Sequence, residues 1–97
     1  MDPNISFSKK STPMFDGNNY VFWSMIMKIY LMVLGNKIWE SVENGYVPPA
    51  TPPTDKDGKL LHVYNSKAMN AIFKSLHNIK FIKVMHCKLA KEIWDKL

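Results

Sequence analysis

Residues 20–34 read YVFWSMIMKIYLMVL, and this stretch, the most apolar in the chain, decides the fold. Ser24 and Lys28, four residues apart, are its only polar interruptions. A stretch that is apolar nearly all round predicts a central, buried helix, with Ser24 and Lys28 marking its one solvent-exposed stripe. Such a helix would be about 22 Å long, shorter than the hydrocarbon core of about 30 Å, so we expect a buried helix and not a membrane span.

Four further stretches space their apolar residues as helices do. These helices are expected at about residues 37–43, 59–76, 79–86 and 88–97. The helix over 79–86 is expected to bury Ile82 and Met85. Asn18 or Asn19 is expected to cap the helix that begins at residue 20, and Gly35 to end it in a left-handed conformation.

A proline-rich loop is expected between the second and third helices. Residues 46–58 contain four prolines and end at Gly58, a composition that excludes helix and central strand alike. Residues 1–13 are polar and hold two prolines, which predicts a flexible N-terminal arm. No segment alternates as a strand does. The sequence therefore predicts one all-α domain over residues 14–97, a compact bundle of about five helices.

Aromatic residues dominate the expected core, because each of the three tryptophans can bury about 150–250 Å². The residues expected in the core are Phe15, Tyr20, Trp23, Trp39, Ala68, Ile72, Ile93 and Trp94. Met69 and Phe73 lie where the apolar stripe of the helix over 59–76 gives way to polar residues. We expect this pair either to pack against the helix over 79–86 or to remain exposed as a small surface for self-association or a partner.

The charge of the chain is positive and uneven. All 13 basic residues are lysines, the formal net charge is +5, and residues 56–97 hold nine lysines against three acids. Sequence-specific readers of nucleic acid usually rely on arginine, so any binding to RNA is expected to be weak and non-specific. The lysines expected to touch a polyanion are Lys74, Lys80, Lys83, Lys88 and Lys91.

No residue pattern in the chain predicts catalysis. The single cysteine, Cys87, cannot form an internal disulfide or a zinc site of ordinary ligand spacing, which fits a reducing compartment. The three histidines are expected at polar positions, and neither a dinucleotide-binding nor a P-loop glycine motif is present. The N-terminus has no apolar signal-peptide region. We therefore expect no enzyme, no cofactor, no metal and no membrane partner.

Four segments carry a resemblance to a known family. They are FDGNNYVFW at 15–23, WESVENGY at 39–46, KAMNAIF at 67–73 and AKEIWDKL at 90–97. In this order and spacing they resemble the start of the Gag polyprotein of plant copia-type LTR retrotransposons. The resemblance covers about residues 13–97. Leu89 departs from the pattern because family members commonly carry Ser or Thr there, and the change removes a helix N-cap worth about 1 kcal/mol.

The resemblance implies a structural protein. It implies a lobe similar to the N-terminal lobe of retroviral capsid proteins, which self-assembles with other Gag subunits into virus-like particles in the cytoplasm. The second lobe and the RNA-binding zinc knuckle of the family would follow Leu97. A second hypothesis is a domesticated Gag lobe, cytoplasmic or nuclear, with which a host protein binds a peptide or a foreign protein. A third is a basic module that touches nucleic acid.

Overall fold

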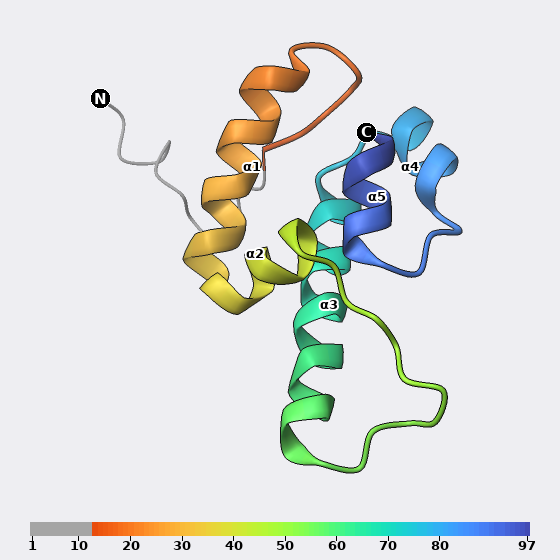
Figure 1. Ribbon diagram of the computed structural model, residues 1–97. Helices are drawn as coiled ribbons and strands as arrows, with labels where there is room; N and C mark the ends of the chain where they lie inside the picture. The colour runs from red at the N-terminus through yellow and green to blue at the C-terminus, as the bar shows by residue number, and fades with distance from the viewer. Residues whose placement is uncertain (1–12) are drawn as a thin grey trace.

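The computed structural model describes residues 13–97, which form five helices and no strand. The helices are α1 (Tyr20–Leu34), α2 (Asn36–Glu43), α3 (Lys56–Lys74), α4 (Asn78–Val84) and α5 (Ala90–Lys96). This confirms the all-α bundle expected from the sequence (Figure 1). The arm expected over residues 1–13 lies outside the described residues except for Pro13.

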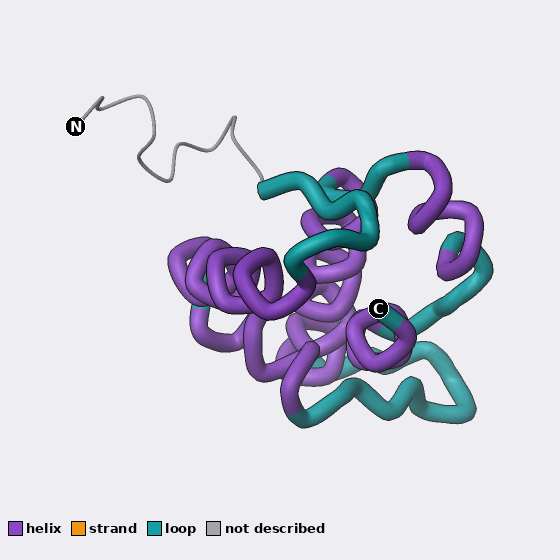
Figure 2. The backbone as a smooth tube through the Cα atoms, turned by 90° about the horizontal axis from the view of Figure 1, so that it is seen from above, coloured by secondary structure: helices purple, strands orange, loops and turns teal. Residues whose placement is uncertain are grey.

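The long helix α3 is the axis of the bundle. Helices α2 and α5 pack against it, and α1 packs chiefly against α2. Helices α1 and α4 lie on opposite sides of the bundle, as two perpendicular views show (Figures 1 and 2). The expectation that α1 is central is wrong, because within residues 13–97 only one of its faces meets the other elements.

The segment before α1 is fixed to the link between α3 and α4. The Phe15 backbone N–H donates to the Ser75 carbonyl at 2.7 Å, and the Phe15 carbonyl accepts from the His77 N–H at 3.0 Å. The Asp16 carboxylate accepts from the Asn18 N–H at 2.9 Å, which lowers the pKa of Asp16 and closes the turn. Phe15 is thereby held against Trp23 of α1, where its ring is fully buried.

The ends of α1 differ from the expected caps. Asn19 occupies the N-cap position with a left-handed backbone, φ 55°. Its side-chain amide makes no capping hydrogen bond to the helix. Gly35 has φ of 162°, which is extended and not left-handed, because this residue also begins the first turn of α2. The two helices thus follow each other with a single residue between them.

Helix α3 begins earlier than the prolines and Gly58 predicted. The Asp55 carboxylate accepts from the Gly58 N–H at 2.9 Å, so Asp55 caps a helix that starts at Lys56. Glycine suits this position because a Cβ on Gly58 would lie 2.8 Å from the Pro53 ring. The last three residues of the loop expected at 46–58 therefore belong to α3.

Helix α4 turns a different side inward from the one expected. Val84 is buried and Phe81 is half-buried, whereas Ile82 and Met85 are exposed. The exposure follows from the position of α4 at the edge of the bundle, where only one narrow face of a short helix finds a neighbour. The expected burial of Ile82 and Met85 is wrong.

The core gathers around the stacked aromatic rings of three segments. Phe15, Trp23, Ala68, Ile72 and Ile93 are buried, and Trp39 and Trp94 are half-buried against them. Tyr20 does not belong to this core: it is exposed, because it stands on the first turn of α1 at the rim of the cluster. Its ring still touches the cluster edge-on, 5.8 Å from that of Phe15.

Asn65 of α3 supplies the cap that α5 lacks. Leu89 offers no side-chain cap, but the side-chain amide oxygen of Asn65 accepts from the Ala90 backbone N–H at 2.9 Å. The Glu92 carboxylate also accepts from the Lys88 N–H at 3.2 Å. A buried side-chain amide from another helix therefore caps α5 and joins it to α3.

Candidate interaction surface

The inner face of α1 is fixed by the aromatic core. The Trp23 indole N–H donates to the Pro13 carbonyl at 3.1 Å, and its ring stacks on Phe15 at 4.7 Å and on Trp94 at 5.3 Å. Met27 and Leu31 follow on the same side and are completely buried. These contacts decide which half of an apolar helix is covered and which half is left to solvent.

The opposite half, which we call the outer face of α1, is apolar and exposed. Its members are Val21, Phe22, Met25, Ile29, Met32 and Val33. Phe22 is 67% exposed, Met25 62% and Val33 66%. A single exposed apolar side chain is ordinary, but a contiguous group of six along one helix is the form of an interaction site.

No charged side chain interrupts the outer face. Lys28 is the only charged residue of α1, and its Nζ lies over the Trp39 ring of α2, 5.4 Å from the centroid. The Ser24 hydroxyl is satisfied within the helix, because it donates to the Val21 carbonyl at 3.0 Å. The stripe expected at Ser24 and Lys28 therefore marks only the border of the outer face.

Met69 and Phe73 do not form an exposed patch. Both are half-buried and pack against the core. The Phe73 ring meets that of Phe81 edge-on at 5.3 Å, and the Asn65 amide donates to the Met69 sulfur at 3.5 Å. The first of the two expectations for this pair, packing against the fourth helix, describes Phe73, whereas Met69 packs against the core. The second, an exposed surface, describes neither residue.

The five lysines expected to touch a polyanion are not equally free. Lys80 lies with its Nζ 5.7 Å from the centroid of the Phe15 ring, and Lys91 pairs with Asp95 at 2.7 Å. The other three, Lys74, Lys83 and Lys88, are exposed. No Asp or Glu occurs between residues 57 and 92, so this part of the chain is purely cationic.

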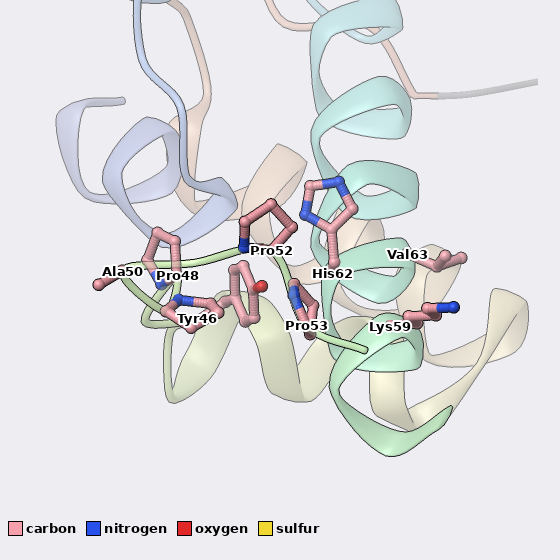
Figure 3. A pocket seen from close by; sticks show the side chains of 9 residues that line it. Tyr46, Pro48, Ala50, Pro52, Pro53, Lys59, His62 and Val63 are labelled. Atoms are coloured by element: carbon pink, nitrogen blue, oxygen red, sulfur yellow. The ribbon is translucent and has the colours of Figure 1, made fainter. Parts of the chain in front are cut away.

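A cleft of about 560 Å³ lies between the proline-rich loop and the first turns of α3 (Figure 3). Tyr46 and four prolines form the loop side, and Lys59, His62 and Val63 form the helix side. The rings of Tyr46 and His62 meet edge-on at 6.0 Å. The cleft is apolar and has the size of a small-molecule or peptide site, but no carboxylate lines it to act as a general acid or base.

The titratable groups of the described chain are scattered. Burial raises the pKa of the Cys87 thiol, and the charge of Glu92 raises it further, so the thiolate is disfavoured. His62 is exposed on α3, and His77 and His86 are exposed in the links before and after α4. Across residues 13–97 no three His, Cys, Asp or Glu side chains gather as metal ligands. Within the same residues no helix combines the length and hydropathy needed to cross a bilayer.

The outer face of α1 was missed by sequence reasoning, which assigned the helix to the interior except for a stripe at Ser24 and Lys28. The signal that points to it is the amount of apolar surface on this helix. A bundle of this size has one core, and Tyr20–Leu34 offers more apolar surface than one side of that core can cover. Comparisons of the chain with protein-family models, with curated proteins and with solved structures find no match.

Proposed function

We propose that this chain is a structural lobe that associates with copies of itself, as expected for the capsid-like N-terminal lobe of a copia-type Gag polyprotein. The observation that supports the proposal is the outer face of α1, six exposed apolar side chains without a charge among them. In water such a face is stabilised when it is covered, at about 25 cal/mol for each Å² of apolar surface removed from solvent.

The size of the outer face predicts a weak contact. A 15-residue helix is about 22 Å long and about 10 Å wide, so one face offers much less than the roughly 800 Å² per partner of a standard interface. Two isolated lobes would then pair only at high concentration. In a closed particle many such contacts act together, and symmetry repeats each of them, so weak pairs suffice.

Sedimentation of the 97-residue chain over a wide range of concentration tests the proposal. We expect reversible association that Met25→Lys abolishes, because a buried ammonium at the centre of the outer face has no partner. The matched control is Ile82→Lys on α4. Met25 and Ile82 are both 62% exposed, and their helices, α1 and α4, lie on opposite sides of the bundle. Association that survives Met25→Lys, or no association at any concentration, would refute the proposal.

The second candidate function is a domesticated lobe that binds a peptide or a foreign protein. The cleft between the proline-rich loop and α3 favours it, because its prolines form a pre-ordered wall and Tyr46 and His62 offer rings for stacking. Chemical shift changes on addition of a peptide library, confined to Tyr46 and His62 and lost in Tyr46→Ala, would support this function. Changes confined to α1 would instead support the first.

A further inference from the structure

The exposed positions of the outer face are arranged symmetrically along α1. Each lies as far before Met27 as another lies after it. The pairs are Phe22 with Met32, Met25 with Ile29, and Val21 with Val33. Phe22, Met25, Ile29 and Met32 also follow one another at intervals of three and four residues, the spacing of a helix that packs along another helix.

This symmetry fits a second copy of the chain better than an unrelated partner. In a contact with two-fold symmetry, residue i of one copy meets residue j of the other and residue j meets residue i. If two α1 helices run antiparallel about an axis level with Met27, Phe22 meets Met32 and Met25 meets Ile29. Every layer of such a contact is then apolar on both sides.

Two features favour the antiparallel over the parallel arrangement. Antiparallel helices place opposite ends of their dipoles beside each other, whereas parallel helices place like ends together. The Phe22 ring would meet the flexible Met32 thioether, a favourable sulfur–aromatic contact, and not a second Phe22. Lys28, the one charge close to the axis, is held at the border of the face by the Trp39 ring and is compatible with either arrangement.

We infer that the partner of the outer face is the outer face of a second copy, with the two α1 helices antiparallel about a two-fold axis at Met27. The inference rests on the proposed function, since it needs the lobe to self-associate. It adds the partner, the orientation and the residue pairs. It does not depend on any contact of the cleft or of α4.

Disulfide trapping of the double variant Phe22→Cys/Met32→Cys tests the orientation. The two positions are ten residues apart, about 15 Å along one helix, so they cannot join within one chain, because a disulfide needs Cα atoms within about 7 Å. Trypsin cleaves at Lys28 and puts residues 22 and 32 on separate peptides. The linked peptides therefore report which residues met between copies.

In the oxidised dimer we expect the peptide of residue 22 joined to that of residue 32. Links of 22 to 22 and of 32 to 32 would overturn the antiparallel arrangement while leaving self-association through α1 intact. The control Ile82→Cys places a thiol on α4 at a position 62% exposed, between the 67% of Phe22 and the 42% of Met32, and the buried Cys87 of the parent chain gives the background. Dimer yield no greater than that of Ile82→Cys would overturn both the inference and the proposed function. Circular dichroism checks that each variant keeps its helices.

Discussion

Helices α1 and α3 share one core but present opposite characters to solvent. α1 buries Trp23 and Leu31, and α3 buries Ala68 and Ile72. Over residues 65–74 the exposed side of α3 carries polar groups such as Lys67 and Asn70, whereas the exposed side of α1 carries the apolar outer face. An amphipathic helix such as α3 has one face to cover, and a helix apolar on both faces has two. Residues 13–97 leave the second face of α1 uncovered, and the proposed self-association would cover it.

The inner face of α1 should show the largest effect on stability. Trp23→Ala removes a buried ring that stacks on two others and bonds to Pro13, so we expect a loss of about 3–5 kcal/mol in the free energy of unfolding. That is comparable to the whole stability of a small domain. Urea or thermal unfolding followed by circular dichroism measures it. The adjacent Phe22→Ala is the control; equal losses in the two variants would mean that α1 has no free face.

Phe73 tests whether the border of α3 is core or surface. Phe73→Ser removes a half-buried ring that packs on Phe81, so we expect a loss of about 2–3 kcal/mol, below the full range for a buried phenylalanine. Self-association per folded molecule should not change, because the outer face of α1 is untouched. Melting temperature and sedimentation together separate the two effects. An unchanged melting temperature with lost association would move the interface from α1 to α3.

The fold was largely predictable because its signals are local. Apolar spacing located all five helices, and prolines located the loop before α3. The early start of α3 escaped prediction because it depends on Asp55, whose carboxylate outweighs the cost of Gly58 in the first turn. The inward side of α4 also escaped, since Ile82 and Val84 are equally apolar in sequence and only tertiary packing distinguishes them.

The candidate surface was less predictable than the fold. Residues 20–34 have no polar side from which burial could be deduced, so periodicity says nothing about which half faces the core. The choice is made by contacts from elsewhere in the chain, above all Phe15 and Trp94 against Trp23. Asn65 was missed for a related reason: its partner, the Ala90 N–H, is distant in sequence.

Asn65 is a buried polar residue of α3 whose side chain stabilises the start of α5. Asn65→Ala leaves the Ala90 N–H buried without an acceptor, so we expect a loss of about 1–3 kcal/mol in the free energy of unfolding. Faster amide exchange in α5 would locate the damage. Asn70→Ala, on the exposed side of the same helix, is the matched control and should change stability little. Similar values for the two variants would mean that Asn65 contributes no cap to α5.

The smallest effects should come from the two exposed sides themselves, and there the comparison of α1 with α3 is most direct. Val33→Ser and Lys67→Ser each change an exposed side chain that makes no bond within residues 13–97, so both should alter stability by no more than about 0.5 kcal/mol. Their surfaces should nevertheless differ. An apolar dye that fluoresces on binding exposed hydrophobic surface should bind the Val33→Ser protein less than the parent, because the outer face has lost one of its most exposed members. It should bind Lys67→Ser unchanged. A loss of more than about 1 kcal/mol in Val33→Ser would indicate that the outer face is already covered within one chain, and the contrast between the helices would then disappear.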